Sequence, residues 1–260
     1  MISIVTVTYN DRVGLKKTLD SVFSQDIAPE YFEYIIVDGA STDGTDQLLD
    51  GYEVDTVLSE ADSGIFDAMN KGLSLSKGKH VLFLNAGDVF YSDEVLSDLY
   101  SASESSGKNT FIFGRVQVSS GNGWVFPPLK VKAPQVFDWL RFKQPHHQAC
   151  LFPIEFYRVN SYVTKYSLTS DMDYKIRALA GSDVVFVDEI LSIFDYNGVS
   201  SNIGTWFKFR LQHGELDSIY KKHNFSYLFR LRVLFNHTLK FFLSFLGKKY
   251  LIKFLRHYYK

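Results

Sequence analysis

Four short polar segments carry most of the residue types that could do chemistry in this chain, and each follows an apolar run. Residues 9–11 (YND) come after the first run, and residues 38–45 (DGASTDGT) come after the second. Residues 60–64 (EADSG) and 85–88 (NAGD) follow the third and the fourth. Carboxylates, amides and hydroxyls of this kind suit hydrogen bonds to a nucleotide and oxygen ligation of a hard cation.

The segment DGASTDGT allows two interpretations. Asp, Ser and Thr favour turns and helix N-caps, so the segment could be only a turn followed by a cap. Asp38 or Asp43 could instead accept a hydrogen bond from a base N–H or a ribose hydroxyl. The chain lacks both G-x-G-x-x-G and G-x-x-x-x-G-K-[ST], which excludes the two common glycine-rich phosphate loops. A bound phosphate must therefore be held in another way.

The segment NAGD offers such a way. It could be a tight turn in which Asp88 caps a following helix. Alternatively, a carboxylate that leaves a central strand can hold Mg²⁺ or Mn²⁺. Such a cation needs one or two carboxylates and completes its shell with waters and phosphate oxygens.

The apolar runs that position these segments are typical of strands over residues 2–8, 34–38, 56–59 and 80–85. Stretches with helical spacing separate them, over residues 12–24, 45–52 and 65–76. This βαβαβ order predicts an α/β fold with a mostly parallel sheet that is flanked by helices. Ligands bind at the carboxyl ends of strands in such sheets, so the four polar segments should meet at one rim.

Beyond residue 108 the predicted order is mixed. We expect a strand over residues 110–118, short and longer helices over 137–142 and 171–180, and a strand over 183–187. From residue 205 the chain is predicted to be helical to its end.

Four strings in this order resemble family-2 inverting glycosyltransferases of the GT-A fold, close to the bacterial polysaccharide subgroup with colanic-acid-type enzymes. They are VTVTYN (5–10), VDGASTDGT (37–45), DSGIFDAMNKG (62–72) and FLNAGD (83–88). The resemblance covers about residues 1–200. It implies a GT-A catalytic domain over residues 1–204, followed by a helical, basic and aromatic C-terminal extension over residues 205–260.

The resemblance also implies roles for single residues on the donor side. Thr8, Tyr9 and Asp38 correspond to contacts with the nucleotide base and ribose, and Asp62 to a carboxylate on the nucleotide side. We further assign Asn85 to the nucleotide-sugar site.

The family's metal motif reads Asp-x-Asp, often followed by a further Asp. Asn85 and Gly87 occupy the two usual carboxylate places here, so Asp88 is the acid that remains. Asp88 is therefore the expected ligand of Mn²⁺ or Mg²⁺.

Residues 168–174 (LTSDMDY) resemble the family's Glu-Asp pair at the start of the acceptor-side helix. Ser170 stands in the Glu position and Asp171 matches the Asp, which makes Asp171 the expected catalytic base and Asp173 the next candidate. Ordinary capping would also place hydroxyls and acids here, because the helix N-terminus favours both.

The cluster PHHQAC (145–150) is the other dense group of polar residues. Adjacent histidines point to opposite faces of an extended segment, so one of them is expected to be structural. Either could contact the acceptor or the donor phosphate, and we assign His147 to the nucleotide-sugar site. Cys150 is expected to be a small buried side chain.

The loop at 196–200 (YNGVS) lies outside this cluster. It could close over a diphosphate.

Composition bounds the class of protein. The 260 residues are 46% hydrophobic and 16% aromatic, enough for a large core, which excludes general disorder. The single cysteine and an N-terminus without a secretory pattern predict a reducing, cytosolic location. The chain shows no run of the roughly 18 apolar residues that a spanning helix needs.

Charge is divided unevenly along the chain. Residues 205–260 hold 12 of the 28 Lys and Arg but only 2 of the 29 Asp and Glu, a net charge of +10 that leaves −11 for residues 1–204. Basic and bulky apolar residues interleave there, as in helices that lie on an anionic membrane. Packing against the catalytic domain could explain part of this pattern. Nucleic acid is not an expected partner, because no recognition motif accompanies the charge.

Together these features predict a metal-dependent inverting glycosyltransferase on the inner face of the cytoplasmic membrane. It would move a sugar from a nucleotide-diphosphate donor to a hydroxyl of a lipid-linked oligosaccharide in bacterial surface polysaccharide synthesis. A processive synthase is disfavoured because no Gln-x-x-Arg-Trp string occurs. A sugar-phosphate nucleotidyltransferase and a non-catalytic membrane scaffold with a degenerate nucleotide site remain alternatives.

Overall fold

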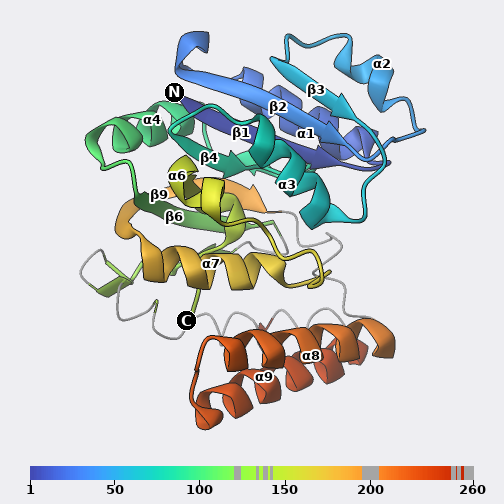
Figure 1. The fold of residues 1–260 in the computed structure, drawn as a ribbon, viewed down its shortest axis with the longest axis vertical. Helices are drawn as coiled ribbons and strands as arrows, with labels where there is room; N and C mark the ends of the chain where they lie inside the picture. Colours follow the sequence, from blue (N-terminus) through green and yellow to red (C-terminus); the bar gives the residue numbers. More distant parts are fainter. Residues whose placement is uncertain are drawn as a thin grey trace.

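The computed structural model describes residues 1–119, 124–132, 135–136, 140, 143–194, 205–246, 250 and 253–254. These residues form one mixed sheet in the order β3-β2-β1-β4-β8-β6-β9-β5, with β7 paired to β6 (Figure 1). The strands are β1 (Ile2–Thr8), β2 (Phe32–Asp38), β3 (Thr56–Ser59), β4 (His80–Phe83), β5 (Val89–Phe90), β6 (Thr110–Val118), β7 (Trp124–Phe126), β8 (Cys150–Pro153) and β9 (Asp183–Phe194).

Helices flank the sheet, as the α/β prediction required. They are α1 (Arg12–Phe23), α2 (Thr45–Leu49), α3 (Ile65–Leu75), α4 (Val95–Ser105), α6 (Ile154–Val159), α7 (Ser170–Gly181), α8 (Trp206–Lys222) and α9 (Tyr227–Phe245), with single 3₁₀ turns η1 (Pro29–Tyr31) and η2 (His147–Ala149).

The N-terminal half of the sheet is parallel, and its register aligns the strand ends. β1 pairs with β2 and β4, and β2 pairs with β3, all in parallel. Thr8 lies opposite Asp38, and Asp38 lies opposite Ser59. The carboxyl ends of three neighbouring strands therefore meet at one rim, as the sequence predicts.

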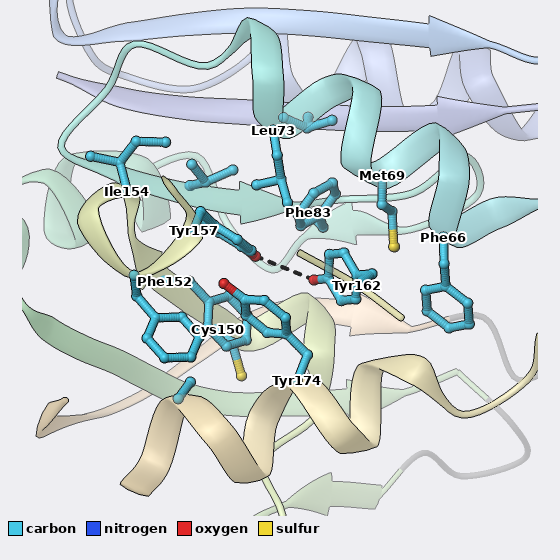
Figure 2. Close-up of a cluster of buried hydrophobic side chains, with 14 of the residues drawn as sticks. Phe66, Met69, Leu73, Phe83, Cys150, Phe152, Ile154, Tyr157, Tyr162 and Tyr174 are labelled. Atoms are coloured by element: carbon cyan, nitrogen blue, oxygen red, sulfur yellow. Dashed lines mark hydrogen bonds between the residues drawn. The ribbon is translucent and has the colours of Figure 1, made fainter. Parts of the chain in front are cut away.

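Both faces of this half are buried because side chains alternate along each strand. On β1, Val5 and Val7 belong to one core cluster, which also includes residues of α3, α6 and α7. Ile2 and Ile4 belong to the cluster on the other face, with residues of α1 and α4. Figure 2 shows the first of these clusters, with aromatic side chains filling the space between the sheet and α7.

The C-terminal half of the sheet is mixed and holds short strands that the sequence did not reveal. β8 runs antiparallel to both β4 and β6, and β5 runs antiparallel to β9. The alternative in which Asp88 caps a following helix is wrong, because β5 begins directly at Val89. Most of the helix expected at 137–142 and the whole loop at 196–200 lie outside the described residues.

The α8–α9 hairpin lies against α7, on the side of α7 away from the sheet (Figure 1). Leu216, Ile219 and Tyr220 of α8 form a separate core cluster with Tyr166 and Ile176. In the part of the chain that the structure describes, no helix is both long enough and apolar enough to span a bilayer. The boundary between two domains at residue 204 stays a prediction.

Candidate active site

The rim at the ends of β1 and β4 holds two buried oxygens without partners. Thr8 ends β1, and its Oγ1 is buried with no hydrogen-bond partner among the described residues. The Oδ1 of Asn85 is likewise buried and has no hydrogen-bond partner among the described residues. The backbone N–H of Ala86 donates to the carbonyl of Val7 at 3.3 Å, so the 85–88 turn lies beside the end of β1. Buried polar atoms are nearly always paired, and unpaired atoms at a strand-end rim point to a ligand.

Asp38 organises the next part of the rim. Its carboxylate is 4% exposed and accepts hydrogen bonds from the Ser59 hydroxyl at 2.6 Å and from the backbone N–H and hydroxyl of Ser41. These bonds connect the end of β2 to that of β3 and fix the loop that follows Asp38. Contact between Asp38 and a nucleotide stays a prediction.

Asp43 fixes the turn that precedes the short helix α2, whose N-cap residue is Gly44. It accepts from the Thr45 hydroxyl at 2.7 Å and from the backbone N–H of Arg12 at 2.8 Å. The Thr45 hydroxyl and the Arg12 amide hold the pKa of Asp43 below its ordinary value. These bonds describe a turn around Asp43, and a contact between Asp43 and a nucleotide stays a prediction.

Tyr9 and Asp62 converge over Gly39. A Cβ added to Gly39 would lie 2.7 Å from Asp62 Oδ2 and 3.1 Å from Tyr9 Cδ2, so a larger residue here would displace the Asp62 carboxylate from this position. Tyr9 is 66% exposed, which leaves its ring open to a planar ligand. Asp62 also accepts from the backbone N–H of Gly64 at 2.8 Å. The structure thus brings these two predicted donor contacts together.

Asp88 stands at the end of the 85–88 turn, which helix α1 holds in place. Gly87 has a φ of +93°, a conformation that L side chains rarely adopt. Thr18 of α1 donates to the carbonyl of Asp88 at 2.8 Å and accepts from the N–H of Gly87 at 3.0 Å. Gln148 Nε2 donates to Asp88 Oδ2 at 2.9 Å. Thr18 therefore holds the backbone of the turn, and Gln148 orients the Asp88 carboxylate.

The donor atoms of this turn suit a hard divalent cation. The described residues offer no cluster of three or more His, Cys, Asp or Glu that could hold a metal without help. Asp88 supplies one carboxylate, and the unpaired Oδ1 of Asn85 supplies a second oxygen. Mg²⁺ and Mn²⁺ accept oxygen ligands, and Mg²⁺ is commonly held by one or two carboxylates with waters and substrate phosphates. The two residues fit a cation that is shared with a donor diphosphate.

His147 lies in the core rather than on the rim surface. Its Nε2 is 2.6 Å from the Tyr162 hydroxyl, and its ring stacks on Phe83 with centroids 5.4 Å apart. Burial lowers the pKa of His147 to about 3, so it is neutral and offers a phosphate no charge. Tyr162 is also linked to Tyr157 through their hydroxyls (Figure 2). This packing gives His147 a structural role, and its contact with a donor stays a prediction.

The other members of the 145–150 cluster are also largely buried. Cys150 is a buried free cysteine, as expected, and burial raises the pKa of its thiol. Burial lowers the pKa of His146 to about 4, and its Nδ1 has no partner among the described residues. The His146 ring contacts Phe194 with centroids 4.3 Å apart.

Asp171 begins the first turn of α7 and keeps access to solvent. Its side chain is 30% exposed, and its Oδ2 is 3.0 Å from Lys175 Nζ. Burial raises the pKa of Asp171, but the Lys175 ammonium lowers it more, so the net pKa lies below its ordinary value. Asp171 is therefore an ionised carboxylate at neutral pH, the form that can accept a proton.

Asp173 has a different environment, which argues against it as a substitute base. Its side chain is fully buried and pairs with Arg177 of α7 and with Lys222 and His223 at the end of α8, all within 2.9 Å. Ser170, in the family's Glu position, is also fully buried, and its hydroxyl accepts from the backbone N–H of Val163 at 2.8 Å. Both residues fix α7, which leaves Asp171 as its accessible acid in the first turn.

Comparison with known proteins identifies the class. Residues 3–164 match the description of Glycosyl transferase family 2, which is more than half of the chain, so the protein belongs to that family. It is 28% identical over 208 residues to an uncharacterized glycosyltransferase of Mycobacterium tuberculosis H37Rv, covering 77% of each chain. It is 27% identical over 216 residues to a PGL/p-HBAD biosynthesis glycosyltransferase of Mycobacterium bovis BCG, covering 78% of this chain and 80% of the relative.

Solved structures confirm the GT-A type fold. S. aureus TarS 1–349 in complex with UDP-GlcNAc aligns with a TM-score of 0.69 at 16% identity, over 93% of this chain and 71% of that one. In a longer TarS structure, the chain spans 44% of the length. The mannosyltransferase PcManGT of Pyrobaculum calidifontis, in complex with GDP-Man and Mn²⁺, aligns with a TM-score of 0.58 at 18% identity, over 85% of this chain and 63% of that one.

Sequence reasoning missed three residues that hold the site. Gln148 orients Asp88, and Lys175 pairs with Asp171. Glu215 of α8 is 6% exposed and accepts hydrogen bonds from Ser167, Leu168 and Thr169, immediately before α7. The i,i+4 spacing of Asp171 and Lys175 was visible in the sequence. Gln148 and Glu215 lie far from their partners in sequence, so no local pattern indicates these contacts.

Proposed function

We propose that this family-2 glycosyltransferase transfers one sugar from a nucleotide-diphosphate donor to an acceptor hydroxyl, with inversion at the anomeric carbon. The observation that carries the proposal is a rim with unpaired oxygens at Thr8 and Asn85 beside the Asp88 carboxylate. The 3₁₀ turn η2 is joined to Asp88 by the hydrogen bond from Gln148. In this proposal Asp88 lies on the donor side of the site and Asp171 on its acceptor side.

The chemistry would be a direct displacement. The acceptor oxygen attacks the anomeric carbon as the bond from that carbon to the diphosphate oxygen breaks, and the hydroxyl proton passes to the Asp171 carboxylate. Lys175 holds Oδ2 of Asp171 and keeps the group ionised. Because one displacement occurs and no covalent enzyme intermediate forms, the anomeric configuration inverts.

Mn²⁺ or Mg²⁺ is the proposed cofactor. Asp88 and Asn85 would hold it, and a bound divalent cation offsets charge that develops on a leaving diphosphate. Support comes from the oxygen-only donor set and from the Mn²⁺ in the PcManGT complex. Tyr9, Asp38 and Asp62 would hold the nucleoside, in line with the UDP-GlcNAc bound by TarS 1–349.

The proposed acceptor is a lipid-linked oligosaccharide in bacterial surface polysaccharide synthesis. One relative carries the description PGL/p-HBAD biosynthesis, and another, 36% identical over 104 residues, is a putative teichuronic acid biosynthesis glycosyltransferase of Bacillus subtilis. Such an acceptor would place the enzyme in the cytoplasm, peripheral on the inner face of the cytoplasmic membrane. The charge of +10 on residues 205–260 supports this location.

Donor hydrolysis tests the proposal. The purified chain is incubated with UDP-, GDP- and dTDP-sugars, with and without Mn²⁺, and the released sugar is followed by NMR. We expect slow, Mn²⁺-dependent hydrolysis of one donor class, with the released anomer inverted relative to the donor. The Asp88→Asn variant should lose the Mn²⁺ dependence. A retained anomeric configuration, or turnover that is equal without metal, would contradict the proposal.

The same assay separates the alternative functions. The family match favours sugar transfer over a sugar-phosphate nucleotidyltransferase, which would release pyrophosphate from a nucleoside triphosphate. A non-catalytic scaffold would bind donor without hydrolysing it. The ionised and accessible Asp171 favours an active enzyme.

A further inference from the structure

Helix α9 carries an exposed apolar stripe along its length. The stripe consists of large side chains that are each between 44% and 78% exposed, namely Leu228, Leu231, Phe235, Phe242, Phe245 and Leu246. Their spacing of mostly three, four and seven residues places them on one side of the helix. Soluble monomers rarely expose contiguous apolar surface on this scale, so the stripe indicates a binding surface.

The opposite side of α9 already packs against α8. The exposed stripe is therefore not the side through which α9 joins the core. His237 and Phe241 are the buried residues of α9, and the Phe241 ring stacks on Phe209 of α8 with centroids 4.3 Å apart. Trp206, at the start of α8, is 58% exposed and lies 5.6 Å from Phe241 by ring centroids, at the edge of this packed interface. The hairpin thus has one packed interior and one apolar exterior.

The charge around the stripe selects its partner. Residues 205–246, which form the hairpin, hold seven Lys and Arg against two Asp and Glu, a net charge of +5, and Arg210, Lys221 and Arg232 are exposed on the two helices. A second copy of the chain would bring two such positive segments together, which like-charge repulsion opposes. Nucleic acid would accept the charge but leave the apolar side chains in water. An anionic bilayer satisfies both features, because it takes apolar side chains at the acyl boundary and basic ones at its headgroups.

We propose that the α9 stripe, with Trp206, inserts into the headgroup and acyl boundary of an anionic bilayer, with α9 lying parallel to the membrane plane. At 19 residues, α9 presents a contact of roughly 28 Å at 1.5 Å per residue. This inference deepens the proposed function, since it gives the lipid-linked acceptor a surface at which the enzyme meets it.

The hairpin is fixed to the helix that carries the proposed base, so docking also orients the site. Lys222 and His223 bind Asp173 of α7 at 2.8 Å each, and Glu215 holds residues 167–169 ahead of α7. The α9 stripe and α7 are thereby tied through α8. A membrane-bound hairpin would hold Asp171 in a defined position relative to the bilayer.

The test uses the full chain and vesicles of phosphatidylcholine, with and without phosphatidylglycerol. We expect co-sedimentation with the anionic vesicles and weak binding to phosphatidylcholine alone. Replacing three stripe residues together, Leu231→Ser, Phe235→Ser and Phe242→Ser, should lower the partition coefficient about a hundredfold or more, since each loses apolar burial. Arg210→Gln and Arg232→Gln should each lower it about fivefold. The matched control is Val159→Ser, another exposed apolar side chain on α6, which should bind normally.

Three outcomes would overturn the inference. The first is unchanged vesicle binding by the triple variant. The second is binding that depends on the arginines alone, which would make the contact purely electrostatic. The third is a wild-type dimer in solution that the triple variant converts to a monomer with vesicle binding unchanged, which would assign the stripe to a second copy.

Donor hydrolysis, measured in solution without vesicles, tests the proposed function independently of membrane binding. The triple variant should keep wild-type hydrolysis and circular dichroism, because its three side chains lie outside the rim. If wild type binds vesicles through the stripe yet hydrolyses no donor, only the proposed function fails. If it hydrolyses donor but ignores vesicles, only the membrane inference fails.

Discussion

Asp88 and Asp171 are both carboxylates, but their surroundings give them different chemistry. Asp88 is 4% exposed and bonded to the neutral Gln148 amide, an arrangement suited to a fixed oxygen ligand. Asp171 is partly exposed and paired with the buried ammonium of Lys175, which lowers the pKa of Asp171 and keeps it ionised. The environment of each residue thus separates the two proposed roles.

Replacing Asp171 by Asn tests the base. The amide keeps the size of the side chain but cannot accept the acceptor proton, so transfer should slow by about 10²–10⁴-fold. Donor affinity, measured by calorimetry, and Mn²⁺ dependence should stay the same. Glu155→Gln, on the exposed surface of α6, is the control and should transfer normally. Near-normal transfer by the Asp171 variant would remove this residue from the mechanism.

The pH profile of transfer provides a second prediction. The pKa of Asp171 lies below its ordinary value of 3.8, so the base form dominates above that pH. Burial lowers the pKa of His146 to about 4 and that of His147 to about 3, so both stay neutral as the pH rises further. With a saturating soluble acceptor, kcat should therefore show no inflection between about pH 5 and 8, the range in which an ordinary histidine titrates. An inflection near pH 6.5 that disappears in His147→Gln would contradict this assignment.

Gln148 orients the Asp88 carboxylate, so removing the Gln148 side chain should weaken metal binding. Side chains that orient a metal ligand typically change metal affinity by about 10–100-fold when they are removed. We expect Gln148→Leu to weaken Mn²⁺ binding in the presence of nucleoside diphosphate by that factor, as measured by electron paramagnetic resonance. Gln47→Leu, exposed on α2, serves as the control. Equal Mn²⁺ affinity in Gln148→Leu and wild type would show that this bond does not act on a metal ligand.

The strand ends could be placed from the sequence, but the roles of the residues there could not. Register does bring Thr8 and Asp38 opposite each other, while their contacts with a donor were implied by the family resemblance and stay predictions. The bond from Gln148 to Asp88 joins positions 60 apart in the chain, and no local pattern encodes it. The burial of His147 depends on Phe83 and Tyr162, which lie far from it in sequence. The assignment of His147 to the donor site therefore rested only on the polar residues next to it in the sequence.

Elements with strong periodicity were predictable, and short ones were not. β1 over Ile2–Thr8 and α3 over Ile65–Leu75 match the expected ranges almost residue for residue, because a buried strand and an amphipathic helix have distinct patterns. β8 has four residues and β5 has two, too few to show any period. Asp88 resembles an N-cap in sequence, but pairing with β9 makes the next residues a strand.

The contact between α7 and α8 depends on Asp173, and this gives a stability prediction. Burial raises the pKa of Asp173, but hydrogen bonds from Lys222 and His223 lower it more, so its folded pKa lies below 3.8. Asp173→Asn should reduce the free energy of unfolding at pH 7 by roughly 3 kcal/mol, the low end for removing one partner of a buried pair, because Lys222 is half exposed.

The pH dependence of that loss has a definite sign. A carboxylate with a lowered folded pKa contributes stability above its unfolded pKa and loses it as the pH falls through the folded one. The difference between wild type and Asp173→Asn in urea unfolding should therefore shrink as the pH falls below 3.8. Asp20→Asn, in an exposed i,i+4 pair with Lys16, should change stability little. A constant difference down to pH 3 would show that Asp173 is not held as an ion.

Acidic and basic residues are concentrated in different parts of the chain. This separation would orient the molecule at an anionic surface. Residues 1–204 carry −11 and residues 205–260 carry +10. The α8–α9 hairpin lies at one end of the molecule, beyond α7 and far from β2, β3 and α2 (Figure 1). An anionic surface would attract that end and repel the body. The charge division was visible in the sequence, whereas the position of the hairpin residues 205–246, which carry +5 of it, required the packing of α8 on α7.

Salt should therefore act on membrane binding while it spares the chemistry. Raising ionic strength from about 0.15 M to about 1 M shortens the Debye length from about 8 Å to about 3 Å, which screens the attraction of the +10 segment to anionic vesicles. We expect co-sedimentation of the full chain to fall steeply over this range and to retain a salt-insensitive remainder, because the α9 stripe contributes an apolar term. The triple stripe variant should lose that remainder. Mn²⁺-dependent donor hydrolysis in the same buffers, without vesicles, is the control, and its rate should change far less than vesicle binding. Binding that is unaffected by salt would assign the contact to the apolar stripe alone, and the charge division would then have no part in orienting the enzyme.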